Sequence, residues 1–429
     1  MLSMALFLLA SPFANVAQAP QMSGVWQSQG YGYVLDLKHG QTNLYHQANG
    51  MCVKDPRGGD PDEQFLVYQE VAADRVAFSG EAGGTRYIFD RIAAVPSACA
   101  EGNPLTPQQK LDFVIANLRA WYPLEARGID LDQAIDDIGP VTNDTDLWKA
   151  LTQVYGVLDD THSEVHAGER TFTAGEALTL ERIGDGEAQK AWLRGYRDGI
   201  LNDILLAQGH HVGNKRVFWG VNGDIGYINI MTMGAFDSEA EDYDTGVLDT
   251  ILDEAMSAFQ GQRAVIVDLG NNRGGYDRVA QAIAPRFANE QRLAYTRGPA
   301  GSPQTEPQAV YTVPSERSRF LGPVYVLTSD ITVSAGETGV LQLKALPNVV
   351  QVGTTTRGAL SDQIVKPLGE GWEVTMSAEI YRDPSGFVPE GKGIAPDVVL
   401  DLYGPQGHAA AVLGLMERIR VGDPSLKTR

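Results

Sequence analysis

Short apolar runs alternate with stretches of helical spacing from about residue 218 onward. Each run would be buried on both faces as a strand, and the runs are Ile225 to Met231, Ala264 to Leu269, Val324 to Thr328 and Val349 to Val352. The helical stretches between them are Val247 to Phe259, Asp277 to Ala284 and Ser334 to Leu346. Continuous apolar strands connected by helices are typical of a sheet with helices on both faces. The alternation therefore predicts an α/β core over residues 215–405, followed by a C-terminal helix and tail at 406–429.

The region before this core is predicted to contain a β-rich part and a helical part. Residues 20–100 carry short alternating stretches between Gly-, Asn- and Asp-rich turns, which indicates a small β-rich domain. Residues 104–214 are expected to form a helical subdomain, because three amphipathic stretches fall within them. The first of these helices begins at Thr106, Pro107 and Gln109, which fit the N-cap, N1 and N3 positions. It should pack against a second helix at about Thr145 to Leu158, whereas the third stretch runs from about Glu187 to Leu206.

The first 19 residues are expected to be a signal peptide. Met4 to Ala10 is an apolar run too short to span a bilayer, and Ala17-Gln18-Ala19 fits the small-x-small pattern of a cleavage site. The predicted product is exported to the periplasm or secreted, after cleavage near Ala19. A buried N-terminal strand is the alternative, since no positively charged residue precedes the run.

The two cysteines, Cys52 and Cys99, both lie in the predicted β-rich domain. In an exported protein such a pair usually forms one disulfide, here closing a loop of 47 residues (99 minus 52). Two free buried thiols are the alternative if the chain is not exported.

The net charge of the chain disfavours a nucleic acid as its partner. With 34 basic and 54 acidic residues the net charge is −20, and no Lys/Arg cluster stands out that could hold a nucleic acid. No stretch of the expected mature chain approaches the length of a transmembrane helix, so neither a nucleic-acid partner nor an integral membrane segment is predicted.

Ser334 is a candidate nucleophile because it follows the Val324 to Thr328 run and opens a predicted helix. The free N–H groups at a helix N-terminus favour negative charge, so the amide of Ala335 could stabilise an oxyanion. The alternative is an ordinary capping box of Ser334 and Glu337. No serine lies in the G-x-S-x-G context of an α/β-hydrolase, and none is followed three residues later by Lys.

A second candidate segment, Asp268 to Gly275, follows the preceding apolar run. Its adjacent glycines let the backbone approach a ligand closely, so Gly274 or Gly275 could supply a second oxyanion donor. The alternative is a tight strand-to-helix turn.

His162 is the best-placed general base among the seven histidines, since it lies in a polar turn just beyond the second helix. A solvated turn histidine is the alternative. A metal site with His166 is not predicted, because H-E-x-x-H is absent and no third ligand stands out.

Together the three segments resemble the tail-specific, or C-terminal processing, serine peptidases, in the branch typified by the tricorn core protease. The resemblance covers residues 105–400 and rests on the order and spacing of five motifs. These are L-D-D-T-H-S near 160, V-I-V-D-L-G-N-N-R-G-G near 270, T-V-S-A-G-E near 334, V-G-T-T-T-R-G from Val352 and E-G-K-G-I-A-P-D from Glu390. It implies a ClpP/crotonase-like α/β core. No stretch between His166 and the core looks like a PDZ domain, so substrate tails should be selected differently.

The resemblance assigns roles to individual residues. Ala359 stands where the processing branch has its lysine base, so a Ser-Lys dyad is not expected there. A histidine preceded by a small hydroxyl residue, as in the tricorn-like branch, matches Thr161-His162. The family's orienting carboxylate maps to Glu390, which implies a Ser-His-Glu relay in which Thr161 also holds the imidazole. Gly270 replaces the arginine of D-L-R-x-N-x-G-G, a departure expected to loosen that turn without removing the oxyanion amides.

The sequence thus predicts an exported serine peptidase that hydrolyses peptide bonds in a peptide or protein substrate through an acyl-enzyme, without a metal or organic cofactor. Two alternatives remain open: a non-catalytic ligand-binding protein on the same fold, and an esterase or amidase that uses the same Ser-His pair. Substrate preference and oligomeric state are not determined by the sequence.

Overall fold

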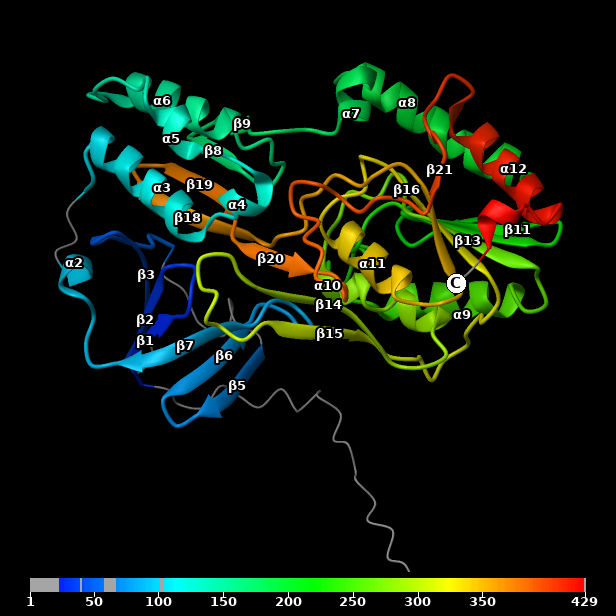
Figure 1. The fold of residues 1–429 in the computed structure, drawn as a ribbon, viewed down its shortest axis with the longest axis horizontal. Helices are drawn as coiled ribbons and strands as arrows, with labels where there is room; N and C mark the ends of the chain where they lie inside the picture. The colour runs from blue at the N-terminus through cyan, green and yellow to red at the C-terminus, as the bar shows by residue number, and fades with distance from the viewer. Residues whose placement is uncertain (1–22, 39–40, 58–66, 101–103, 428–429) are drawn as a thin grey trace, which may run out of the picture.

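The computed structural model describes residues 23–38, 41–57, 67–100 and 104–427 (Figure 1). The expected signal peptide, with its cleavage site near Ala19, lies outside the described residues. The described part is a mixed α/β structure with a β-rich N-terminal region, as the sequence predicts.

The N-terminal region forms one antiparallel sheet with the strand order β4-β3-β2-β1-β7-β6-β5. Its strands are β1 (Gly24–Ser28), β2 (Tyr33–Lys38), β3 (Gln41–Ala48), β4 (Met51–Lys54), β5 (Val67–Ala72), β6 (Arg75–Ser79) and β7 (Tyr87–Ile92). Alternate side chains gather on one face, where Trp26, Leu35, Phe78 and Phe89 form a small apolar core. In Figure 1 this sheet occupies the lower left.

The central sheet has the strand order β10-β11-β12-β13-β16-β17-β21. Its strands are β10 (His210–Val212), β11 (Val217–Asn222), β12 (Ile225–Ile230), β13 (Ala264–Asp268), β16 (Val324–Thr328), β17 (Val349–Gly353) and β21 (Val398–Val399). Pairing is parallel from β12 to β21 and antiparallel from β10 to β12. The carboxyl ends of the parallel strands therefore meet at one edge, where the loops after β13 and β16 lie close together.

Both faces of the central sheet are covered, which explains why its inner strands carry apolar residues at successive positions. In β13, Val265 and Val267 face a core shared with α9 (Gly246–Ala258) and α11 (Ala335–Lys344). Ala264 and Ile266 face the opposite core, shared with α8 (Glu187–Asp198), the π-helix η1 (Gly199–Ile204) and α12 (Gly407–Arg420). The side-chain period of two thus assigns successive residues of each strand to different layers.

Two smaller sheets complete the β-structure of the described residues. One has the order β15-β14-β20 and the other β18-β19-β8-β9. Their strands are β8 (Glu164–Ala167), β9 (Arg170–Thr173), β14 (Arg292–Pro299), β15 (Gln308–Thr312), β18 (Gln363–Gly369), β19 (Trp372–Ser377) and β20 (Glu379–Arg382). The antiparallel pairing of β8 with β19 joins the segment after α6 to the C-terminal part of the core.

The predicted helix pair of residues 104–214 is present and packs together. Its two helices, α3 (Pro107–Trp121) and α6 (Asp144–Gly156), share one apolar core, and α3 begins with the predicted capping box of Thr106 and Gln109. Besides α8 and η1, the described residues before the central sheet also form the helices α2 (Ser97–Ala100), α4 (Leu124–Arg127), α5 (Leu131–Ile135) and α7 (Leu178–Ile183). This region also contains β8, β9 and β10. Strand β8 pairs with the distant β19, which helical periodicity does not reveal, whereas β9 pairs with β8 and β10 pairs with β11.

One predicted helix of the core is shorter than expected. Instead of a helix from Asp277 to Ala284, the chain forms α10 (Asp277–Ala280) and then the 3-10 helix η2 (Ala284–Phe287). Pro285 lacks a backbone N–H, and its ring clashes with the carbonyl four residues earlier, so a regular helix cannot continue through it. A further 3-10 turn, η3 (Pro424–Leu426), follows α12. Among the described residues, no helix combines the length and apolarity that a bilayer crossing requires.

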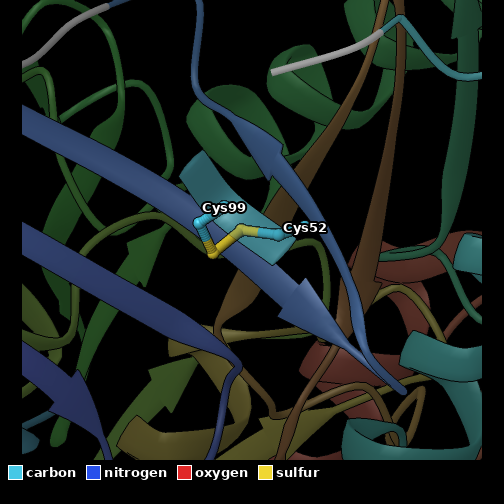
Figure 2. The surroundings of a disulfide bond; sticks show 2 residues. All are labelled: Cys52 and Cys99. Carbon is cyan, nitrogen blue, oxygen red and sulfur yellow. A yellow bond between two sulfur atoms is a disulfide. The ribbon is translucent and has the colours of Figure 1, made fainter. Parts of the chain in front are cut away.

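The predicted disulfide between Cys52 and Cys99 is confirmed. Figure 2 shows Cys52 on strand β4 joined to Cys99 on helix α2. The bond closes a loop of 47 residues and attaches the edge strand of the N-terminal sheet to the chain that leads into the helical region.

We expect loss of this bond to lower the free energy of unfolding by about 4 kcal/mol, since an open 47-residue loop raises the entropy of the unfolded chain. Chemical denaturation of the Cys52→Ala/Cys99→Ala variant beside wild-type protein measures this difference. Titration of free thiols in denatured wild-type protein is the control and should find none. Equal midpoints and slopes for the two proteins would contradict the expectation.

Candidate active site

Ser334 lies at a sharp turn between strand β16 and helix α11, with a backbone φ of +58° and ψ of −128°. The predicted capping box with Glu337 is present, but it does not account for this conformation, because an N-cap residue ordinarily has an extended backbone. A residue with a side chain held at positive φ is strained, and such strain is found at functional sites. A strained strand-to-helix turn is also how α/β-hydrolases expose their nucleophilic serine.

Glu337 anchors the start of α11 from inside the protein. Its side chain is fully buried, with 0% exposure, and its oxygens accept hydrogen bonds from Thr356 Oγ1 at 2.5 Å, Gly358 N at 2.8 Å and Ala359 N at 2.9 Å. The N–H of Ser334 donates to Glu337 Oε2 at 3.3 Å and to the Ala359 carbonyl at 3.0 Å. Burial raises the pKa of Glu337 to about 7. These bonds hold Ser334 against the segment around Ala359.

The loop after β13 approaches Ser334 closely. A Cβ added to Gly274 would lie 2.7 Å from Ser334 Cβ and 3.3 Å from its Oγ, so only glycine fits here. The N–H of Gly274 donates to Asn272 Oδ1 at 2.9 Å. Within the described residues, the N–H groups of Gly275 and Ala335 have no hydrogen-bond acceptor. Two unpaired backbone donors are therefore present in the segments that flank the serine.

Packing explains why Gly270 stands where the related motif has arginine. A Cβ at this position would lie 2.8 Å from Leu402 Cδ1 and 3.1 Å from Asp268 Oδ1. The C-terminal segment thus occupies the space that a longer side chain would need. The turn is not loose, because Ser329 Oγ donates to the Gly270 carbonyl at 2.6 Å.

His162 lies in the turn between α6 and β8, and its backbone is held on both sides. Its N–H donates to Asp160 Oδ1 at 3.0 Å, and its carbonyl accepts from Thr375 Oγ1 at 2.9 Å and Gln363 Nε2 at 3.2 Å. Burial lowers the pKa of the imidazole below its ordinary value, whereas the charge of Asp160 opposes that shift. A histidine with a lowered pKa is neutral at physiological pH and can accept a proton.

Glu390 is buried with 0% exposure near this turn but contacts neither Thr161 nor His162 directly. Its oxygens accept from Arg127 Nη2 at 2.5 Å and from the N–H groups of Leu360 and Ser361 at 3.1 and 3.2 Å. Among the described residues, Thr161 Oγ1 and His162 Nδ1 are buried without a hydrogen-bond partner. The structure therefore does not join these groups into the direct relay that the sequence implies.

Arg127 and Asp160 supply a link that sequence reasoning missed. Arg127 Nη2 lies 3.1 Å from Asp160 Oδ1, so Glu390, Arg127 and Asp160 form a buried chain of charges that ends at the backbone of His162. Burial would raise the pKa of Asp160, but Arg127 and His162 hold it below its ordinary value. Asp160 was visible in the L-D-D-T-H-S motif. Arg127 lies 35 positions before His162 in an unremarkable stretch, and no local pattern indicates its role.

The serine and histidine turns border one pocket of about 540 Å³. Its lining includes Thr161 and Val333, which immediately precede His162 and Ser334. Arg357 bridges the two turns, since its N–H donates to the Thr332 carbonyl at 3.0 Å and its Nη2 lies 2.7 Å from Asp159 Oδ1. Arg357 is thus already paired within the protein.

The site thus combines a strained serine at a helix start with a histidine turn that borders the same pocket. Residues 224–400 match the model of peptidase family S41. The matched range includes Ser334, Ala335, Gly274, Gly275 and Glu390, and it leaves out His162.

Individual known proteins are also similar to this chain. A carboxy-terminal-processing protease of Bartonella bacilliformis is 26% identical over 209 residues, which are 49% of this chain and 44% of the relative. The match thus spans less than half the length of that relative. A crystal structure from Parabacteroides merdae, described as a peptidase, superposes with a TM-score of 0.59 at 23% identity, over 73% of this chain and 97% of that one. Mature CPAF in complex with lactacystin superposes with a TM-score of 0.53 at 14% identity, over 74% and 99%. These two structures support the fold alone.

We expect Ser334→Gly to be more stable than Ser334→Ala by about 1 kcal/mol, because glycine adopts a positive φ without strain. The larger entropy that glycine loses on folding opposes this gain and is included in the expected difference. Chemical denaturation of the two variants gives the difference. Both also remove the side-chain cap, so the matched control is Thr106→Gly against Thr106→Ala at an N-cap with a φ of −67°. The difference at Ser334 should exceed the one at Thr106, and an equal or smaller difference would show that the turn is not strained.

Proposed function

We propose that this protein is a serine peptidase in which Ser334 is the nucleophile and His162 is the general base. The observation that carries the proposal is the strained placement of Ser334 at the start of α11, beside two unpaired backbone N–H groups. The pocket shared by the residues before Ser334 and His162 offers room for a peptide segment next to the serine.

In the proposed reaction His162 accepts the proton of the Ser334 hydroxyl while Oγ attacks the carbonyl carbon of the scissile peptide bond. The N–H groups of Ala335 and Gly275 donate to the resulting oxyanion. Gly274 is the weaker candidate, because its N–H is already bonded to Asn272. The protonated imidazole then gives its proton to the leaving amine as the C–N bond breaks. Water, deprotonated by His162, hydrolyses the acyl-enzyme and regenerates the serine.

Glu390 enters this proposal as a positioning residue rather than a direct partner of the imidazole. Its contact with Arg127, and the contact of Arg127 with Asp160, support a role in holding the turn that carries His162. Thr161 Oγ1 and His162 Nδ1 are adjacent in the chain and unpaired among the described residues. A small movement on substrate binding would let Thr161 orient the imidazole, as proposed from the family resemblance.

Export is also part of the proposal. A disulfide persists in oxidising compartments such as the periplasm or the cell exterior, so the bond between Cys52 and Cys99 supports a location outside the cytoplasm. N-terminal sequencing of the protein isolated from its source would test cleavage near Ala19.

Reaction with a fluorophosphonate probe, followed by intact-mass analysis, tests the nucleophile. We expect one adduct on Ser334 in wild-type protein, and none in Ser334→Ala or His162→Ala, because the hydroxyl and its base are each removed. Circular dichroism of the variants controls for folding. An adduct that persists in Ser334→Ala would remove this mechanism. A folded wild-type protein without an adduct would favour the ligand-binding alternative, and matched ester and peptide substrates separate the peptidase from an esterase.

The pH dependence of kcat/KM tests His162. A base must be neutral to act, so the rate rises as pH rises through the pKa of the imidazole, which burial places below 6.5. We expect the midpoint of the acid limb below pH 6.5 in wild-type protein. We expect a lower midpoint in Asp160→Asn, because a charge that raises the pKa of His162 is removed.

Asp159→Asn is the matched control, since Asp159 is the neighbouring residue in the same turn and is mostly exposed. Its acid limb should coincide with that of wild-type protein. A midpoint that moves upward in Asp160→Asn would show that the titrating group is not His162.

A further inference from the structure

A second pocket, of about 390 Å³, shares Arg273 with the pocket beside Ser334. Five cationic side chains line it: Lys190 and Arg197 from α8, Lys215 and Arg216 from the β10–β11 turn, and Arg273 from the loop after β13. No carboxylate is part of its lining. We call it the basic pocket. In a chain with 54 acidic and 34 basic residues, such a local excess of positive charge is unexpected.

The cations of the basic pocket are largely unneutralised. Lys190 pairs with the exposed Glu187 at 3.0 Å. Within the part of the chain that the structure describes, no carboxylate oxygen lies within 4.0 Å of the cationic groups of Arg197, Lys215, Arg216 or Arg273. Burial lowers the pKa of the neighbouring His211, and the charges of Arg197 and Lys215 lower it further.

The pocket also contains unmet hydrogen-bonding groups. Asn271 is only 1% exposed, yet neither its Oδ1 nor its Nδ2 has a partner among the described residues, and the same holds for Arg197 Nε. A buried polar group without a partner is costly, so these atoms are suited to a polar ligand. Asn271 lines the pocket together with the five cations.

The basic pocket adjoins the proposed catalytic centre through one loop. Arg273 immediately precedes Gly274, which packs against Ser334, and consecutive Cα atoms are only about 3.8 Å apart. Arg273 also lines the pocket that Thr161 and Val333 border. A peptide that lies across Ser334 and passes over Arg273 would therefore enter the basic pocket within a few residues.

We propose that the basic pocket is a specificity subsite that binds the side-chain carboxylates of an acidic peptide segment near the scissile bond. The proposal rests on the proposed peptidase function and names its substrate class. A carboxylate binds one arginine in a bidentate manner, so five cations spread over three elements exceed the need of a single terminal carboxylate. More than one acidic side chain accounts for them.

Fluorescence anisotropy with full-length Ser334→Ala protein tests the proposal without turnover. Three labelled peptides share one sequence: an amidated peptide with Glu and Asp at several positions, an amidated peptide with Gln and Asn instead, and the Gln/Asn peptide with a free C-terminus. We expect the acidic peptide to bind about tenfold more tightly than either neutral-side-chain peptide at low ionic strength, and this advantage should shrink with added salt.

Charge variants locate the binding. Arg197→Gln/Lys215→Gln in the Ser334→Ala background should weaken the acidic peptide about five- to tenfold and leave the Gln/Asn peptide within about twofold. The single variant Lys215→Gln, at an exposed position, should give part of this loss if the double variant folds poorly. Lys149→Gln is the matched control for Lys215→Gln, because it removes one lysine charge from α6, which lies far from α8 in Figure 1.

Three outcomes would overturn the proposal: equal binding of the acidic and Gln/Asn peptides, the same loss in Lys149→Gln, or tightest binding by the free C-terminus. The probe reaction of Ser334 decides the peptidase function separately. If the protein binds the acidic peptide but forms no probe adduct, the peptidase function is refuted and the acidic-peptide subsite stands. If the protein forms the adduct but shows no preference for acidic peptides, the subsite is refuted and the peptidase function stands.

Discussion

Two buried carboxylates determine the geometry of the candidate site. Glu337 accepts hydrogen bonds from Thr356, Gly358 and Ala359, and Glu390 accepts them from Leu360 and Ser361. The segment from Thr356 to Ser361 is therefore held from both sides by side chains without solvent exposure. Since Ser334 donates to this segment and Gln363, just beyond it, donates to the carbonyl of His162, the serine and histidine turns share one support.

Burying these two carboxylates lowers the stability of the folded protein, because the charged form loses its hydration. The raised pKa of both groups, about 7, reflects this loss. Backbone N–H donors compensate Glu337, and Arg127 provides a charge between Glu390 and Asp160. Buried ion pairs seldom stabilise a fold more than apolar packing would, yet removing one member leaves an uncompensated charge. The network is thus better explained by the precise position that it gives the His162 turn than by the stability of the core.

The sequence predicted those features that depend on local signals. The apolar runs of the central sheet, the Thr106 cap and the cysteine pair each need only nearby residues or a known chemical preference, and each is present. The position of Ser334 after β16 followed from the same logic. The ion pair of Arg127 with Glu390 and the pairing of β8 with β19 could not be predicted in this way, since the two partners lie more than 200 positions apart in each case. Long-range contacts also explain why the ion pair of Glu390 with Arg127 could not be predicted, whereas the Ser-His-Glu relay stays a prediction.

The N-terminal sheet has a physical connection to the site that neither its sequence nor the family match indicates. Thr85 Oγ1 donates to Asp362 Oδ2 at 2.5 Å and lies 3.2 Å from Glu379 Oε2, and Tyr31 donates to Glu379 Oε1 at 2.9 Å. Asp362 lies between Ser361, which Glu390 holds, and Gln363, which contacts the His162 turn. The matched S41 region contains the serine, the helical region supplies the histidine, and the N-terminal sheet contacts the segment that supports both. The geometry of the site is accordingly a property of the docked chain, because no single region holds all the groups that position Ser334 and His162.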